Sequence, residues 1–311
     1  MTEQEITKAE KRKIWKANRA ILETDNYKRK RSGKKSKSRW SLFVKVLSLF
    51  EFFLKIFGLY KIGYKNAKNI EIKKVTLNYS NLPKEFDGYK LLHLTDLHID
   101  SIPGLEKIII EKIKGLKYDL CVMTGDYRKS TFGSFKNILK PIYRLTQYIN
   151  APDGTFAVLG NHDTYLMSNY EERINIELLV NESAEIKRGG GKIILTGTDD
   201  PFRYFTDQAI IALEESKKGF KIALVHTTEL SDVAAESGYN LYLCGHTHGG
   251  QICLPGGKPL ITHQFEGKGY YKGLWNHNGM KGYTSKGCGV SGLNVRFNCP
   301  GEITVFTLKK N

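Results

Sequence analysis

Residues of the kinds that bind metal ions follow five short apolar runs of this 311-residue chain. In chain order they are Asp96, His98, Asp126, Asn161, His162, His226, His246 and His248. Each run has the length and composition of a buried strand. Layered α/β folds bind ligands beyond the carboxyl ends of their strands, because the loops converge there. A single Asp or His at such a place is usually a turn or surface residue, but recurrence after five strands indicates one shared site.

The spacing of these side chains favours a pair of metal ions. Alternation along an extended segment places Asp96 and His98 on the same side, and likewise His246 and His248. The two later histidines can share one ion or reach two neighbouring ions, and the carboxylate of Asp126 can bridge. Oxygen and imidazole donors without thiolate suit Mn, Fe, Zn or Mg rather than a structural zinc site. Two such ions about 3.5–4 Å apart form a clamp that hydrolyses phosphoesters.

Five ordered motifs contain these residues. They are Asp-x-His at 96–98, Gly-Asp at 125–126, Gly-Asn-His-Asp at 160–163, the strand-end His226 and Gly-His-Thr-His at 245–248. The set resembles the calcineurin-like metallophosphoesterase superfamily over residues 70–311, which we therefore expect to be the catalytic domain. The resemblance implies an α/β fold in α+β layers, a two-sheet β-sandwich flanked by helices. It also implies a metal-dependent phosphodiesterase or pyrophosphatase.

The resemblance further implies a role for each matching residue. One ion would be held by Asp96, His98, Asp126 and His248. The other would be held by Asp126, Asn161, His226 and His246. Asp126 would bridge the two ions, and His162 would stabilise or protonate the departing oxygen. Mn is the expected ion, with Fe, Zn or Mg as alternatives, since such donors leave the choice to metal availability.

The chain departs from one branch of the superfamily. Protein Ser/Thr phosphatases carry a second Asp that orients the catalytic His, whereas this chain has GDYRKS at 125–130. The departure leaves the orienting partner of His162 unassigned, and Asp163, a second catalytic candidate, is the nearest residue for that role. Arg128 and Arg296 are the expected substrate-binding residues, because guanidinium groups suit bidentate recognition of phosphate. Lys129 and Arg203 also lie near motif positions and are further candidates for binding phosphate.

The elements that position these residues follow from the alternation of β-rich and helical stretches after residue 70, a pattern of sheets covered by helices. Helices are expected at residues 104–115, 134–148, 168–180 and 206–217. The Gly-rich stretch 245–292 is expected to form loops around the site. Five scattered cysteines without a Cys-x-x-Cys pair argue against a disulfide scaffold.

Most of the positive charge lies at the N-terminus. Residues 1–40 carry 14 Lys and Arg against 5 Asp and Glu, a net +9 of the chain's total of +16. A run of this kind is usually solvated and mobile. We therefore expect a flexible basic arm over residues 1–40.

The next segment, 41–62, is expected to form an amphipathic membrane-anchor helix. Lys45, Glu51 and Lys55 fall on one helical stripe, opposite a broad face rich in Phe and Leu. This pattern is typical of a helix that lies in the membrane interface. The expected localisation is peripheral, at the cytoplasmic face of the bacterial inner membrane. Packing on the protein's own core and a true membrane span are the alternatives. A span would need a run of about 18 uncharged residues, and the segment contains none.

Finer motifs suggest a substrate. The runs 197–201, 244–257 and 291–308 look like the membrane-associated branch of bacterial phosphodiesterases, which includes a UDP-2,3-diacylglucosamine pyrophosphatase of lipid A synthesis. The expected reaction releases UMP and 2,3-diacylglucosamine 1-phosphate. The alternative is a general phosphodiesterase for another lipid-linked, nucleotide or nucleic-acid diester. The expected partners are a membrane surface and a lipid-linked nucleotide sugar. No protein partner is implied, and nucleic acid is not expected, since the body carries no long basic stripe.

Overall fold

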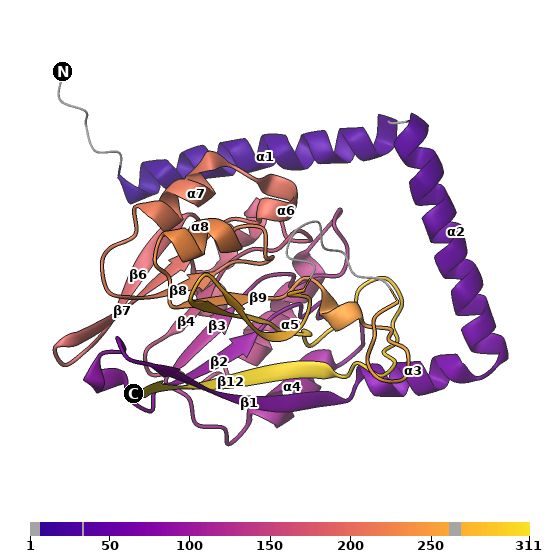
Figure 1. Cartoon of the computed structure of the whole chain (residues 1–311). Coiled ribbons are helices and arrows are strands. Elements are labelled where there is room, and N and C mark those ends of the chain that lie inside the picture. The colour runs from indigo at the N-terminus through magenta and orange to yellow at the C-terminus, as the bar shows by residue number, and fades with distance from the viewer. Residues whose placement is uncertain (1–6, 33, 261–268) are drawn as a thin grey trace.

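The computed structural model describes the main chain of residues 7–32, 34–260 and 269–311, and their side chains except at 27–44. Within these residues, two six-stranded sheets form a sandwich with helices on both outer faces (Figure 1). The expected α/β fold, a two-sheet sandwich flanked by helices, is confirmed.

The first sheet is mixed, because its second strand in space runs parallel to the first and antiparallel to the third. In spatial order its strands are β1 Ile70–Tyr79, β12 Gly301–Lys310, β2 Lys90–Leu94, β3 Leu120–Met123, β4 Thr155–Ala157 and β5 Glu177–Leu178. The second sheet runs β10 Gly273–His277, β11 Met280–Thr284, β9 Leu241–Cys244, β8 Phe220–Leu224, β7 Gly191–Gly197 and β6 Glu182–Arg188. Strands β2, β3 and β4 are mutually parallel, and so are β7, β8 and β9. Their carboxyl ends therefore open onto a common edge of each sheet.

Alternating side chains build three apolar layers. Leu91 and Ile222 point into the core between the sheets, whereas their neighbours Leu92 and Ala223 point to the outer faces. The first sheet is covered by α4 Leu105–Ile113 and α5 Lys136–Thr146, and the second by α7 Asp207–Glu214 and α8 Ser231–Glu236. Shorter elements are η1 Lys84–Phe86, η2 Tyr165–Tyr170, η3 Glu172–Ile174, α6 Pro201–Tyr204 and η4 His248–Gly250.

Two expectations about local structure are corrected. Residues 168–180 do not form a helix, because the chain passes through η2 and η3, turns at Asn175 in the left-handed region (φ 52°) and joins the sheet as β5. The stretch 245–292 is not loop throughout, because it contains the β10–β11 hairpin. The hairpin turns at Asn278 and Gly279, both with positive φ, as a two-residue Asn-Gly turn requires.

The N-terminal part is helical. Helix α1, Lys8–Ser32, lies along the body, α2, Lys34–Ile56, runs down one side, and α3, Leu59–Ala67, leads into β1 (Figure 1). A flexible arm is therefore the wrong description of α1, in which Trp15 and Arg19 are buried against the body. The expected helix 41–62 is present, but it is divided between α2 and α3. It is interrupted at Gly58, whose φ of 70° is one that residues with a side chain rarely adopt.

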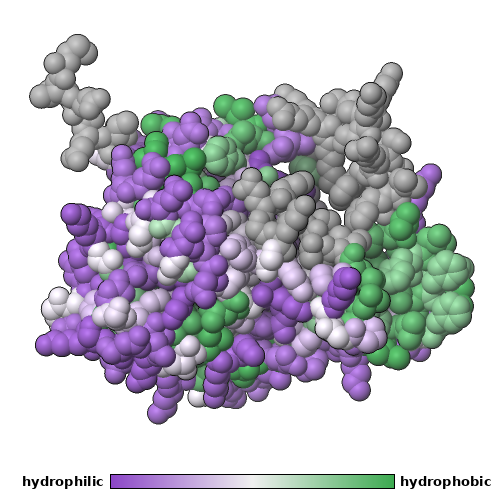
Figure 2. All heavy atoms as spheres, viewed as in Figure 1, coloured by the Kyte–Doolittle hydropathy of each residue, from purple (hydrophilic) through white to green (hydrophobic). Residues whose placement is uncertain are grey.

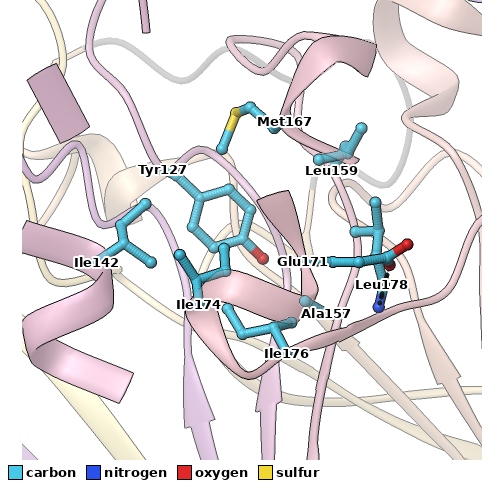
Figure 3. A pocket seen from close by; sticks show the side chains of 9 residues that line it. All are labelled: Tyr127, Ile142, Ala157, Leu159, Met167, Glu171, Ile174, Ile176 and Leu178. Carbon is cyan, nitrogen blue, oxygen red and sulfur yellow. Dashed lines mark hydrogen bonds between the residues drawn. The ribbon is translucent and has the colours of Figure 1, made fainter. Parts of the chain in front are cut away.

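A narrow cavity of about 20 Å³ lies behind β4, between the sheet and η2. Figure 3 shows its walls, which are Tyr127, Ile142, Ala157, Leu159, Met167, Glu171, Ile174, Ile176 and Leu178. With almost entirely apolar walls and room for little more than one water molecule, it belongs to the core. It is too small to hold a substrate.

Candidate metal centre

The strand ends bring together the side chains that the sequence singled out. Three groups of acids and imidazoles have ligand atoms within 4.8 Å of one another. They are Asp96, His98 and His248; His98, Asp126 and His162; and Asp126, His226 and His246. The residues come from the ends of β2, β3, β4, β8 and β9, so both sheets contribute. All except the partly exposed His162 are buried.

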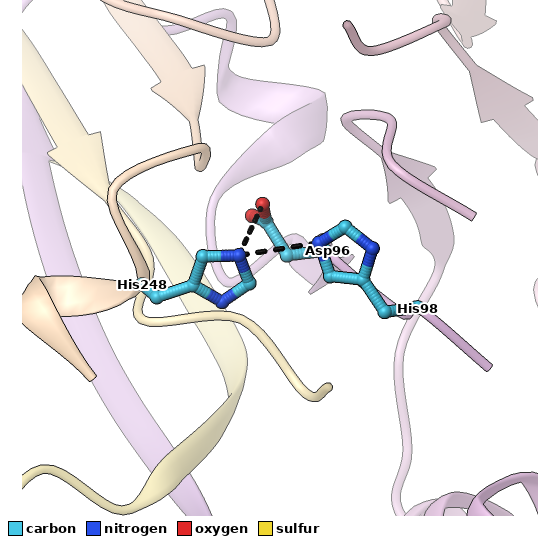
Figure 4. Close-up of side chains that lie close together, drawn as sticks. All are labelled: Asp96, His98 and His248. Carbon is cyan, nitrogen blue, oxygen red and sulfur yellow. Dashed lines mark hydrogen bonds and ion pairs between the residues drawn. The ribbon is translucent and has the colours of Figure 1, made fainter. Parts of the chain in front are cut away.

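The first group is built around two facing imidazoles (Figure 4). The Nε2 atoms of His98 and His248 lie 3.2 Å apart, and Oδ1 of Asp96 is 3.5 Å from Nε2 of His248. Nδ1 of His98 donates to the main-chain carbonyl of Arg128 at 2.8 Å. Since a carbonyl only accepts, the proton of His98 lies on Nδ1 and its Nε2 offers a lone pair to the site. Burial also lowers the pKa of His98, which favours this neutral form.

The second group uses an amide oxygen. Nε2 of His226 lies 3.0 Å from Oδ1 of Asn161 and 3.4 Å from Oδ2 of Asp126. Nδ1 of His246 lies 2.8 Å from the same amide oxygen. His226 donates from Nδ1 to the carbonyl of Thr124 at 2.7 Å, so its Nε2 also faces the site.

Asp126 connects the two groups. Its Oδ2 is 3.6 Å from Nε2 of His98 in one direction and 3.4 Å from Nε2 of His226 in the other. Burial by itself would raise the pKa of Asp126, but the imidazoles of His226 and His162 outweigh it and hold that pKa well below its ordinary value. An ionised carboxylate placed between two ligand groups is suited to bridge two cations.

The donor set fits two divalent ions. It combines carboxylates, an amide oxygen and imidazole nitrogens, and in His98 and His226 the proton is held on the far side of the ring. Within the described residues, no cysteine joins these groups, and all five cysteines are buried and free. When bound, such a pair of ions supplies Lewis acidity and a water of lowered pKa.

The main chain at the site is strained. Asp96, His98, Asp126, His246 and His248 all have positive φ, between 34° and 70°. Such backbone is uncommon outside glycine and costs of order 1–3 kcal/mol for each residue unless the surroundings enforce it. Five strained ligands in one site indicate that the fold holds these side chains in place at the expense of stability.

Two motif glycines are required for space. A Cβ on Gly160 would overlap Oδ1 of Asp126, and a Cβ on Gly245 would overlap Oδ2 of Asp96. A side chain at either glycine position would therefore displace the carboxylate that lies against it. This explains the glycine that precedes Asn161 and the glycine that precedes His246.

The expected role of Asp163 is corrected. Its fully buried carboxylate accepts main-chain N–H bonds from Gly160 at 2.8 Å, Asp126 at 2.7 Å and Tyr127 at 2.9 Å. Both oxygens are used in this way, and burial raises the pKa of Asp163 to about 7. Asp163 thus clamps two site loops together and does not orient His162.

His162 is oriented by a carbonyl instead. Its Nδ1 donates to the main-chain oxygen of Lys129 at 2.6 Å, and its Nε2 lies 3.9 Å from Oδ2 of Asp126. The ring also contacts that of His98, with centroids 4.8 Å apart. Sequence reasoning missed this partner, because a main-chain oxygen carries no residue-type signal.

The substrate contacts expected of Arg128 and Arg296 are not supported. Both side chains are buried, at 3% and 0% exposure, and their guanidinium groups donate to main-chain carbonyls. Arg128 binds those of His162, Gly133 and Thr131. Arg296 binds those of His248, Cys299, Lys286, Gly287 and Gly289. Both residues hold site loops.

Arg203 is placed differently. It is half-buried, and its guanidinium group has no hydrogen bond or ion pair within the described part of the chain, while its positive charge contributes to lowering the pKa of His162, after burial. Helix α6 presents it, and the ring of the preceding Phe202 lies 4.5 Å from that of His246. The carboxylate of Asp200 caps α6 by accepting from the N–H groups of Phe202 and Arg203. The Asp-Pro pair at 200–201 is a sequence signal that could have predicted this short helix.

Comparison with known proteins agrees with the geometry. A family model described as Calcineurin-like phosphoesterase matches residues 89–250. The metallophosphoesterase YkuE of Bacillus subtilis is 32% identical over 259 residues, which cover 79% of this chain and 88% of that protein. The phosphodiesterase YaeI of Escherichia coli is 30% identical over 234 residues, 71% of this chain and 82% of that protein. A transmembrane protein with metallophosphoesterase domain from Danio rerio is 26% identical over 78% of this chain and 58% of its own length.

Proposed function

Since the chain belongs to the calcineurin-like phosphoesterase family and is a metal-dependent phosphoester hydrolase, we propose that it acts at a membrane surface on a lipid-linked substrate. The specific substrate we put forward is UDP-2,3-diacylglucosamine, hydrolysed to UMP and 2,3-diacylglucosamine 1-phosphate. The observation that carries the membrane part is an exposed apolar surface on α2 and α3.

We call this the lipid-facing surface. It consists of Val46, Leu49, Phe50, Phe52, Phe53, Ile56, Phe57, Leu59 and Ile62, each between 36% and 70% exposed. Figure 2 shows the corresponding hydrophobic region at the side of the molecule where α2 and α3 meet. Packing on the protein's own core accounts only for another stripe of α2, where Leu47 and Leu54 contact Leu293 and Val295. A contiguous exposed surface of this size usually marks an interaction site.

The charges around this surface favour anionic lipid. Lys45, Lys55, Lys61 and Lys65 are exposed on the same two helices. Each lysine near an anionic membrane contributes about 1 kcal/mol of attraction. None of the described helices combines the length and the apolar character needed to cross a membrane. On the basis of the exposed apolar surface and these lysines, we propose that α2 and α3 lie on the bilayer, at its cytoplasmic face.

The residues of the chain divide the chemistry as follows. The two ligand groups hold the divalent ions, for which we propose Mn²⁺. The Lys129 carbonyl keeps a proton on Nδ1 of His162 in both protonation states of the ring. When Nε2 is also protonated, it donates to the oxygen that leaves the phosphorus. Arg203, with its free guanidinium group, binds a non-bridging phosphate oxygen.

Arg203→Gln should raise KM for a soluble diester about 10-fold with little change in kcat. A hydrogen bond to a charged group contributes about 1.5–3 kcal/mol, and 1.4 kcal/mol corresponds to a factor of ten. Steady-state kinetics on bis(p-nitrophenyl) phosphate would measure both constants. Arg173→Gln is the matched control, because it removes an exposed arginine on η3 whose one contact among the described residues is with the Tyr170 ring. Equal KM values for the two variants would contradict the assignment.

Replacing Phe53 and Phe57 together by Ser should weaken binding to vesicles of phosphatidylglycerol and phosphatidylcholine about 10- to 100-fold. The two side chains are 47% and 70% exposed, and burying a Phe contributes about 1.5–3 kcal/mol. Turnover of a soluble diester should not change. Vesicle co-sedimentation measures the binding. The control replaces Tyr143 and Tyr148, which are equally exposed aromatic residues at α5, and vesicle binding that falls equally in both variants would contradict the proposal.

The substrate is tested in one reaction. Purified protein with Mn²⁺ is incubated with UDP-2,3-diacylglucosamine in detergent micelles, and mass spectrometry identifies the products. UMP and 2,3-diacylglucosamine 1-phosphate are the expected result. If the lipid survives while an aryl phosphodiester is cleaved, the substrate is wrong and the general phosphodiesterase alternative holds.

A further inference from the structure

We propose that helix α1 supports the active site, and that Arg19 is a positioning residue for the loop that carries Asn161 and His162. The proposal goes beyond the function above and does not depend on membrane binding. It rests on the contacts that α1 makes with both ends of this loop.

Arg19 reaches the loop from outside. Its side chain is completely buried, and Nη1 forms an ion pair with Asp199. Nη2 donates to the carbonyl of Asp163 at 3.2 Å and, in a longer contact of 3.5 Å, to the carbonyl of Gly160. Gly160 and Asp163 are the residues on either side of the pair Asn161 and His162. One guanidinium group therefore spans the two residues that face the metal centre.

The guanidinium group is itself held on several sides. The Tyr204 ring lies over it, with the guanidinium carbon 3.3 Å from the ring centroid. The Trp15 indole donates to Oδ2 of Asp199 at 2.7 Å and so fixes the acid that pairs with Arg19. Arg19 Nε donates to Glu23 at 3.2 Å. Arg19 and its ion-pair partner Asp199 are thus each held by further contacts.

Glu23 extends the contact to the far end of the loop. Its carboxylate accepts from the hydroxyl of Thr164 at 2.7 Å and from the N–H of Tyr165 at 2.8 Å. Helix α1 thus binds the chain before Asn161 through Arg19 and the chain after Asp163 through Glu23. Burying a charged side chain completely costs free energy. A helix could be attached to the body without this cost, so the burial of Arg19 indicates a further role. Arg12 already attaches α1 through partly exposed ion pairs with Glu171 and Glu182.

Loss of Arg19 would leave the loop free to shift. Asn161 shares its amide oxygen with His226 and His246, and His162 must face the departing oxygen, so a shift moves a metal ligand and a reacting group together. A misplacement of about 1 Å can cost about 100-fold in rate. Because these groups act in the reaction itself, kcat should fall more than KM rises.

The test uses the full chain. With Mn²⁺ and a soluble diester that has an alkyl leaving group, Arg19→Gln should lower kcat about 10- to 100-fold while KM changes less than about 3-fold. Arg19→Lys should restore part of kcat, because it keeps the charge and one donor. Arg12→Gln is the matched control, an arginine of the same helix without contact to the loop. Equal kcat values for Arg19→Gln and Arg12→Gln, with both variants folded by circular dichroism, would overturn the proposal.

A second measurement does not depend on turnover. Titration with Mn²⁺ followed by electron paramagnetic resonance should show weaker binding of one ion in Arg19→Gln and unchanged binding in Arg12→Gln. If Arg19→Gln does not fold, Glu23→Gln decides the matter, since it preserves shape and loosens the contacts of this carboxylate with Arg19, Thr164 and Tyr165. Glu23→Gln should lower kcat about 3- to 10-fold, and unchanged kcat and Mn²⁺ binding would overturn the proposal. Should the membrane proposal fail, these results still stand, because no lipid is present.

Discussion

Asp126→Asn should abolish hydrolysis and greatly reduce the binding of both ions. The substitution preserves size but removes the negative charge that lies between His98 and His226. Without it, each ligand group loses its shared carboxylate, and two cations are left close together with less charge to offset their repulsion. We expect kcat to fall at least about 1,000-fold. Inductively coupled plasma mass spectrometry would measure the metal content of the purified variant.

The control for this variant is Asp119→Asn. Asp119 is a partly exposed acid that forms an ion pair with Arg188 away from the site. Its removal should leave metal content and kcat as they are. Two bound ions per chain in Asp126→Asn would contradict the bridging role, whatever the activity.

His162→Ala should lower kcat about 100- to 10,000-fold while both ions stay bound. The estimate is the range that a positioned general acid usually contributes. Metal binding should persist, because the six other acids and imidazoles of the ligand groups and Asn161 are unchanged. Kinetics with two leaving groups separate the effect. The loss should be large for an alkyl leaving group and small for p-nitrophenolate, which departs without a proton.

The role of His162 would be wrong if both substrates slowed equally. In that case the ring would serve packing, for instance through its contact with His98. His277→Ala is the control, since this histidine pairs with Asp232 on the surface beside β10 and is outside the three ligand groups.

The structure also changes how the membrane proposal must be tested. Deleting residues 1–60 would remove the lipid-facing surface, but it would also remove Arg19 and Glu23 from the loop at Asn161. A loss of activity would then have two causes. The Phe53 and Phe57 substitutions avoid this problem, because both side chains are exposed on α2 and neither contacts the site.

The sequence by itself determined the ligand groups of the site. Asp96, His98, Asp126 and His226 each follow an apolar strand within four residues, and parallel strands bring their carboxyl ends to one edge. Both steps depend on local patterns, namely alternation within a strand and position relative to its end. For this reason the predicted metal-binding side chains do lie together, and the two-sheet sandwich is as expected.

Only the tertiary structure decided what each remaining polar group does. Arg128 and Arg296 have the right residue type for phosphate, yet burial and nearby carbonyls commit them to holding loops. The basic residues of α1 suggest solvent, yet Arg19 is buried because Asp199, 180 positions away, offers it a partner. A contact between residues so far apart in the sequence produces no pattern of residue spacing from which it could be predicted. Residue type and spacing therefore located the chemistry, and long-range packing determined which side chains are free to take part in it.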